Sequence, residues 1–96
     1  MIRRSSVALL LVASIAAAAP PPAKFTQEYQ AGVDAFRLGK FDDARAHLEK
    51  ARTLAPKLPG PYRFLAAVAQ AQQRWDDCVA SARRALELNP ASTEAG

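Results

Sequence analysis

The sequence predicts an all-α fold made of two consecutive helix-turn-helix units that follow an N-terminal signal peptide. Half of the 96 residues are apolar, and no segment alternates apolar and polar residues as a β-strand would. The chain repeats itself with a period of 34 residues, and each repeat carries apolar residues at the three- and four-residue spacing of one helix face. A chain of this length fits one small domain and excludes a multidomain enzyme.

Residues 1–18 have the three parts of a secretory signal peptide. The apolar run is shorter than the roughly twenty residues that a membrane span needs, and three prolines end it. We therefore expect cleavage, no membrane span afterwards, and a periplasmic or secreted protein; an organelle transit peptide is less favoured because the central run is too apolar. Cleavage is expected after Ala18, with Ala16 as the alternative. The three parts are Arg3 and Arg4, the apolar residues 7–19, and the small residues Ala16 and Ala18.

Removal of the signal peptide changes the charge balance. Two of the thirteen Lys and Arg lie in it, which leaves eleven bases against nine acids with both signs interleaved. Such a chain has no electrostatic footprint for nucleic acid, and no nucleic-acid partner is expected. Residues 19–24 are Pro-rich and lack periodic apolar residues, which favours an extended spacer over a polyproline ligand for another domain.

The internal repeat is found by sliding residues 25–56 forward by 34 positions, which gives seven identities in 32 aligned pairs. Conservative replacements support the alignment: Gly32 pairs with Ala66, and Phe41 pairs with Trp75. The identical pairs are Ala35 with Ala69, Asp42 with Asp76, Asp43 with Asp77, Ala46 with Ala80, Ala51 with Ala85, Leu54 with Leu88, and Pro56 with Pro90.

Each repeat is predicted to contain two helices, with turns near Gly39, Pro59 and Arg74. Paired aspartates open the second helix of each repeat and complement its dipole, and a proline follows its end. The buried stripe of the first such helix is Phe41, Ala44, Leu48, Ala51 and Leu54, and that of the second is Trp75, Cys78, Ala82, Ala85 and Leu88.

A 34-residue period with paired helices, small residues midway and a closing proline resembles the tetratricopeptide repeat. The resemblance implies a short α-solenoid with one repeat over residues 25–58, a second over 59–92, and a C-terminal tail at 93–96. Two positions depart from the family pattern: Glu28 replaces a large apolar residue and predicts a frayed first helix, and Ala82 predicts a thin contact in the second repeat. The residues that carry the resemblance are Ala31, Gly32, Ala35, Ala44, Leu48, Ala51 and Pro56, then Leu65, Ala66, Ala69, Cys78, Ala82, Ala85 and Pro90.

Small residues in this pattern permit close approach of helices. Gly32 and Ala66 are expected to let the two helices of a pair touch, and Ala51 and Ala85 to let the next pair stack behind.

The resemblance also implies a concave face lined by the first helix of each pair. This face is apolar with two arginines, and it is expected to bind an extended peptide or a partner helix, with arginine chelating a carboxylate. The chain would then act as an adaptor or assembly factor. Alternatively, Tyr29, Val33 and Phe36 pack against a neighbouring chain. The predicted contact residues are Tyr29, Val33, Phe36, Arg37, Arg63, Ala67 and Gln70.

The far end of the predicted stack is uncovered. Two repeats are fewer than the three or so that usually give independent stability. The sequence therefore also predicts a possible homo-oligomer, a cap supplied by a partner, or a role as the N-terminal part of a longer scaffold.

No residue pattern points to chemistry, so we expect no enzyme, no cofactor, no metal site and no catalytic residue. One His and one Cys cannot form a zinc site from protein ligands alone. His47 is predicted to be solvated on the polar side of its helix, Cys78 to be an inert packed thiol, and Trp75 to be a core residue.

Overall fold

The computed structural model describes residues 20–89, and it contains four α-helices and no strand within that range. The all-α prediction with two helix pairs is therefore confirmed. The predicted signal peptide, residues 1–18, and the predicted tail, residues 93–96, lie outside the described residues. The helices are α2 (Ala23–Arg37), α3 (Phe41–Leu54), α4 (Pro59–Ala71) and α5 (Trp75–Leu88).

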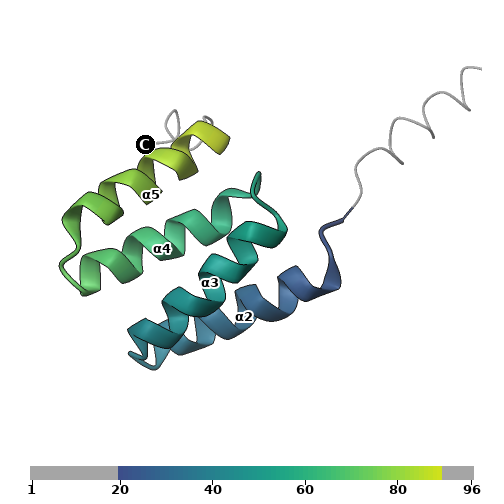
Figure 1. Ribbon diagram of the computed structural model, residues 1–96, viewed down its shortest axis with the longest axis horizontal. Coiled ribbons are helices and arrows are strands. Elements are labelled where there is room, and N and C mark those ends of the chain that lie inside the picture. The colour runs from purple at the N-terminus through teal and green to yellow at the C-terminus, as the bar shows by residue number, and fades with distance from the viewer. Residues whose placement is uncertain (1–19, 90–96) are drawn as a thin grey trace, which may run out of the picture.

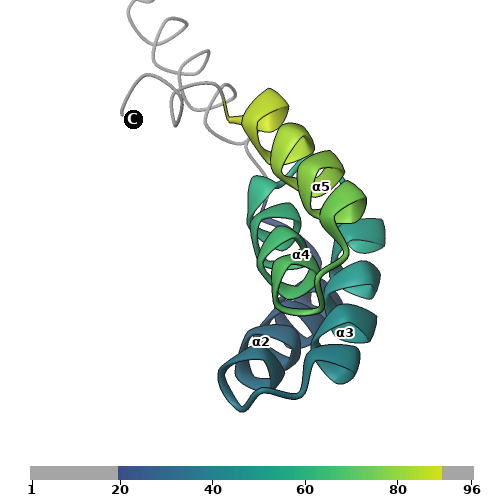
Figure 2. The same cartoon turned by 90° about the vertical axis from the view of Figure 1, so that its left-hand side faces the viewer.

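The helices form two stacked hairpins, α2 with α3 and α4 with α5 (Figure 1). Helix α4 lies against α3 much more closely than against α2. Seen from the side, α2 and α4 form one layer while α3 and α5 form the other (Figure 2). This arrangement leaves one broad face made only of first helices.

The same turn closes both hairpins. In the first, the N–H of Lys40 donates to the carbonyl of Ala35 at 2.9 Å and Gly39 takes a positive φ of 77°. In the second, the N–H of Arg74 donates to the carbonyl of Ala69 at 2.8 Å. This is the Schellman arrangement, whose left-handed residue is usually glycine. The second hairpin instead places Gln73 there, with φ 59°.

Helix α2 starts earlier than the predicted end of the spacer, because its first two residues, Ala23 and Lys24, belong to the segment expected to be extended. The fraying predicted from Glu28 is absent: α2 is continuous from Ala23 to Arg37 and Glu28 is only 8% exposed. Its carboxylate has partners on two helices, described below, which satisfy the buried charge.

The core lies between α2, α3 and α4. Ala44, Leu48 and Ala51 on α3 are completely buried. Gly32 of α2 lies so close to Leu48 that a Cβ added at Gly32 would be 2.6 Å from the leucine Cγ. The prediction that Gly32 permits close approach within the first pair is confirmed. The five buried residues at the centre of the core are Ala35, Ala44, Leu48, Leu65 and Val68.

Helix α5 is buried much less than the repeat predicts. Among its described residues only Ala85 is buried, and Trp75, predicted to be a core residue, is 59% exposed. The difference has a simple cause: α3 is covered by α4, whereas no described helix covers the corresponding side of α5. A residue pattern identifies the face of a helix but does not supply the neighbour that would bury it.

Polar contacts connect the two repeats across their boundary. The Tyr62 hydroxyl donates to the carbonyl of Pro56 at 3.0 Å, and the Gln72 amide donates to Asp42 at 2.7 Å. Within the second repeat, Arg84 lies over the Tyr62 ring, 5.9 Å from its centroid. None of the helices within residues 20–89 has the length and apolar character required to cross a bilayer.

Candidate functional site

The exposed side of α2 and α4 is built over linked aromatic rings. Phe64 of α4 meets two rings of α2 edge to face, Tyr29 at 5.9 Å and Phe36 at 5.8 Å between centroids. Phe25 stacks on Tyr29 at 5.5 Å, and Phe41 tilts against Phe36 at 5.8 Å. Such contacts are favourable beyond the area they bury. The rings therefore hold α2 and α4 together where their backbones are well separated.

Tyr29 keeps its position because of a glycine on the neighbouring helix. A Cβ placed on Gly60, in the first turn of α4, would lie 2.6 Å from the Tyr29 hydroxyl. The missing side chain lets the phenol lie over the start of α4. Burial raises the pKa of this phenol, and the nearby Arg63 guanidinium partly offsets the effect.

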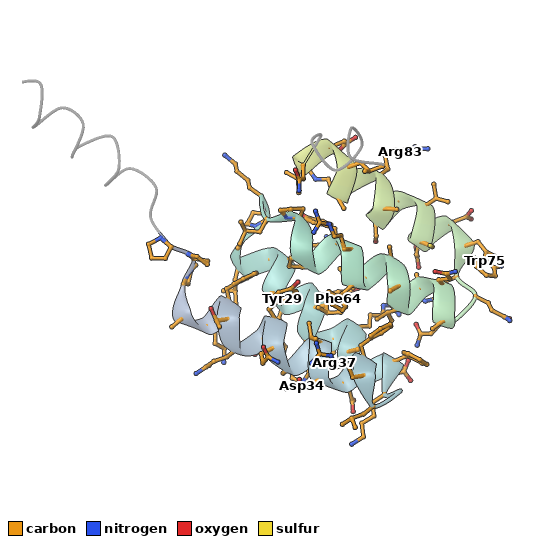
Figure 3. All side chains as sticks on the ribbon, turned by 180° about the vertical axis from the view of Figure 1, so that it is seen from behind. Tyr29, Asp34, Arg37, Phe64, Trp75 and Arg83 are labelled. Carbon is orange, nitrogen blue, oxygen red and sulfur yellow. The ribbon has the colours of Figure 1, made fainter. Side chains whose placement is uncertain are left out.

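The predicted contact residues fall into two groups. Val33 is buried, at 8% exposure, and Tyr29 and Phe36 are half-buried within the aromatic cluster, so these three mainly support the face. Arg37, Arg63 and Gln70 are exposed and Ala67 is half-buried. Figure 3 shows Arg37, Tyr29 and Phe64 on this same side of the molecule. We call the exposed and half-buried residues on this side the first-helix face; they are Tyr29, Phe36, Arg37, Arg63, Phe64, Ala67 and Gln70.

Phe64 was not among the predicted contact residues, although it contacts two of them. It aligns with Gln30 in the first repeat, so the 34-residue comparison gives no aromatic partner for it. Helical spacing contains the signal, because Phe64 precedes Ala67 by three residues and thus lies on the same side of α4.

A second surface feature is a groove of about 370 Å³ between α3 and α5. Four arginines line it, but three of them pair with nearby carboxylates: Arg45 with Glu49 at 3.3 Å, Arg84 with Glu87 at 3.2 Å, and Arg74, just before α5, with Asp77. These pairs neutralise much of the groove. The lining residues are Arg45, Glu49, Arg52, Tyr62, Leu65, Arg74, Asp77, Ala80, Ser81 and Arg84.

The predicted solvation of His47 holds only in part, because its side chain is 38% exposed and also bonds to Glu28. Its Nδ1 donates to the Glu28 carboxylate at 2.7 Å, between α3 and α2, and the residue is half-buried. Lys24 lies 3.6 Å from the other carboxylate oxygen. The hydrogen bond from His47 lowers the pKa of Glu28, burial opposes it, and Lys50 and Lys24 add to the lowering. His47 thus fastens α2 to α3.

The remaining candidate for chemistry is Cys78, a free thiol that is half-buried on α5. Within residues 20–89, no three or more His, Cys, Asp or Glu side chains are grouped so that they could hold a metal ion.

Comparison with known protein families agrees with the two helix pairs. The profile of the family described as tetratricopeptide repeat matches residues 29–50 and 59–84, which together make up half of the chain. The first match spans most of α2 and much of α3, and the second spans α4 and most of α5. Comparison with curated proteins and with solved structures gives no significant match.

Proposed function

The chain belongs to the tetratricopeptide repeat family, whose non-catalytic repeats generally mediate protein–protein interaction, and from this premise we propose that it is an exported adaptor or assembly factor binding an extended peptide on its first-helix face. The observation that carries the proposal is the combination, on this face, of an aromatic floor with two exposed arginines, Arg37 and Arg63.

The chemistry of this face favours a peptide with a carboxylate next to an aromatic or apolar side chain. The rings of Tyr29, Phe36 and Phe64 are half-buried. Packing holds them in place, and their exposed parts can contact an apolar or aromatic side chain of the peptide. A guanidinium presents a planar pair of N–H donors that matches the two oxygens of a carboxylate. Gln70 adds an exposed amide that can bond to the backbone of an extended chain.

Fluorescence polarisation with a labelled peptide that ends in Phe and a free carboxylate tests this proposal. Arg37→Glu and Arg63→Glu should each weaken peptide binding about fivefold. Each variant loses an ion pair with the peptide carboxylate and adds a glutamate that repels it. Arg52→Glu, an exposed charge reversal on α3, is the matched control and should bind as the parent does. Equal peptide binding by the parent and all three variants contradicts the proposal. Equal affinity of the parent for the peptide with a free C-terminus and for the same peptide with an amidated C-terminus contradicts it too.

Photo-crosslinking in cells can identify the partner once binding is established. The exposed positions Arg37 and Gln70 are better sites for the crosslinker than Tyr29 or Phe36, whose rings are part of the packing. A crosslinker at Arg52 reports capture by the opposite layer.

The export part of the proposal rests on the sequence of residues 1–18. Mass spectrometry of the protein purified from cells that express the full chain should give a mature form that starts at Ala19. A start at Ala17 would indicate the alternative cleavage site, and a protein that keeps residues 1–18 would contradict export through a cleaved signal.

A further inference from the structure

We propose that the outer face of the second repeat is a second binding surface, for an amphipathic helix of a partner protein whose apolar stripe is bordered by carboxylates. The first observation is a row of apolar side chains on the exposed side of α5. Trp75, Val79 and Leu86 are 59%, 54% and 47% exposed. With Ala82 they recur at positions i, i+4, i+7 and i+11, which is one face of a helix. We call these four residues the α5 stripe.

The first repeat shows what this face does when it is covered. Shifted back by 34 residues, the α5 stripe falls on Phe41, Arg45, Leu48 and Arg52 of α3. Leu48 is completely buried there between α2 and α4 and Phe41 is half-buried, whereas Arg45 and Arg52 stay exposed. Ala82 therefore occupies the position that a stacked helix covers in the first repeat, and Val79 and Leu86 occupy the exposed edge of that contact.

A hollow of about 290 Å³ marks the corresponding place on the second repeat. Its floor is made of Ala66, Ala82 and Ala85, and Leu86 and Arg63 form its walls. Ala82 stands where the first repeat has Leu48, which is the thin contact that the sequence predicts at this position. The alanine floor permits a helix to approach closely, as Gly32 permits the approach of α3 to α2.

The edges of this surface define the chemistry of its occupant. Val79 and Leu86 stand where the first repeat has Arg45 and Arg52. An occupant therefore needs apolar residues opposite Val79 and Leu86. On the other edge, Arg63 and Gln70 stand where the first repeat has Tyr29 and Phe36, the two rings that contact Phe64 of α4. An occupant therefore needs polar or acidic residues opposite Arg63 and Gln70.

Exposed cations border the α5 stripe on both sides. Arg63 lies on the α4 side of the hollow, and Arg83 lies beyond the stripe on α5 (Figure 3). A helix with carboxylates on both sides of its apolar stripe matches this distribution of charge and apolar surface.

A second copy of this chain fits the surface poorly. If a second copy stacked as the second repeat stacks on the first, Glu28, Asp43 and Lys50 would take the positions that Tyr62, Asp77 and Arg84 now hold. Glu28 already binds His47 and Lys24. Its charged outer side would have to cover Val79 and Leu86, which costs desolvation without a partner for the charges.

Trp75 is the sole tryptophan of the chain, so its fluorescence reports directly on this surface. The probe is a synthetic amphipathic helix of about four turns, with Leu at i, i+3, i+4 and i+7 and Glu along both borders. The matched control probe has Lys in place of every Glu. The acidic probe should shift the Trp75 emission to shorter wavelength and bind about tenfold more tightly than the basic probe.

Variants locate the site. Val79→Lys and Leu86→Lys should weaken binding of the acidic probe at least about tenfold, because each replaces an apolar side chain that the bound probe would cover with a charged one. Leu38→Lys is the matched control, since Leu38 is 71% exposed and lies at the end of α2. Arg83→Glu should invert the preference between the two probes. It is used in place of an Arg63 variant because Arg63 also borders the first-helix face.

Two results would overturn the proposal. One is equal binding of the acidic and basic probes, or none. The other is a blue shift of Trp75 that grows with protein concentration without probe and coincides with dimers in sedimentation velocity, which would make a second copy the occupant. Arg37→Glu should leave binding of the acidic probe unchanged, so failure of this proposal and failure of the proposed function are distinguished.

Discussion

Single residues decide how closely the first hairpin can close, and Gly32 is the clearest case. The Cβ of an alanine at this position would lie 2.6 Å from the Cγ of Leu48, which is completely buried and has no free space to move into. The steric requirement of one contact therefore outweighs the poor helix propensity of glycine.

Gly32→Ala should destabilise the protein by about 1–3 kcal/mol, as overpacking of a core does. Helix propensity alone predicts the opposite sign, a gain of roughly 0.8–1 kcal/mol. Urea unfolding followed by circular dichroism separates the two. The double variant Gly32→Ala with Leu48→Ala should lose less stability than the two single losses added together, because the two residues share one space.

Glu28 makes stability depend on pH at the acidic end. Its pKa is lowered in the folded protein, chiefly by the hydrogen bond from His47, with Lys50 and Lys24 contributing. The ionised carboxylate thus stabilises the fold at pH values above the ordinary glutamate value of 4.5, and this stabilisation is lost as the pH falls from there through the lowered pKa.

We expect Glu28→Gln to lower the urea midpoint of unfolding at pH 7. The difference in midpoint between this variant and the parent protein should narrow as the pH approaches 3. Glu49→Gln, which removes an exposed pair with Arg45, is the control and should change little at either pH. A constant difference between parent and Glu28→Gln from pH 7 to pH 3 would show that this carboxylate does not contribute through its charge.

At the scale of elements, the two hairpins form the same turn with different residues at the positive-φ position. Gly39 adopts its positive φ at no steric cost, whereas Gln73 adopts nearly the same angle with a side chain attached. The second hairpin therefore carries a strain that the first lacks.

Gln73→Gly should raise stability by about 1 kcal/mol, and Gly39→Gln should lower it by a similar amount. Thermal unfolding at equal protein concentration measures both. If Gln73→Gly proved destabilising, the side chain of Gln73 would have to make a contact that compensates for its backbone conformation.

Most helix boundaries, though not the start of α2 at Ala23, were predictable because they depend on local chemistry. Phe41 and Trp75 begin their helices where the sequence predicts, and Pro59 begins α4, since glycine, proline and paired aspartates act over a few residues. The partners of side chains were less predictable. His47 and Glu28 are nineteen positions apart, and periodicity alone does not show that they meet.

The candidate site was predictable in part. The resemblance to the tetratricopeptide repeat placed Arg37, Arg63 and Gln70 on the face formed by the first helices, and the structure has them exposed. It could not show that Val33 is buried or that Phe64 joins Tyr29 to Phe36, because both depend on how α4 stacks beside α2. The exposure of Trp75 depends likewise on a neighbour that its repeat pattern presupposes.

At the scale of the whole molecule, equivalent residues of the two repeats have different surroundings. Ala51 is completely buried under α4, whereas Ala85, at 5% exposure, lines the hollow on the outer side of the second repeat. The same alanine thus closes an interface in one repeat and leaves space in the other.

Ala51→Leu should cost about 1–3 kcal/mol by forcing the two hairpins apart, while Ala85→Leu should change stability by less than about 0.5 kcal/mol. Chemical unfolding of both variants tests this, with Ala44→Leu as a second fully buried site expected to behave as Ala51→Leu does. Equal losses at positions 51 and 85 would contradict the difference in surroundings.

The two ends of the stack are unlike, with charged side chains outside α2 and α3 and apolar ones outside α5. This gives the molecule a direction. A copy of the second repeat placed after α5 would meet an apolar surface, whereas a copy placed before α2 would have to cover the charged Glu28. An array descended from this chain could lengthen at one end only.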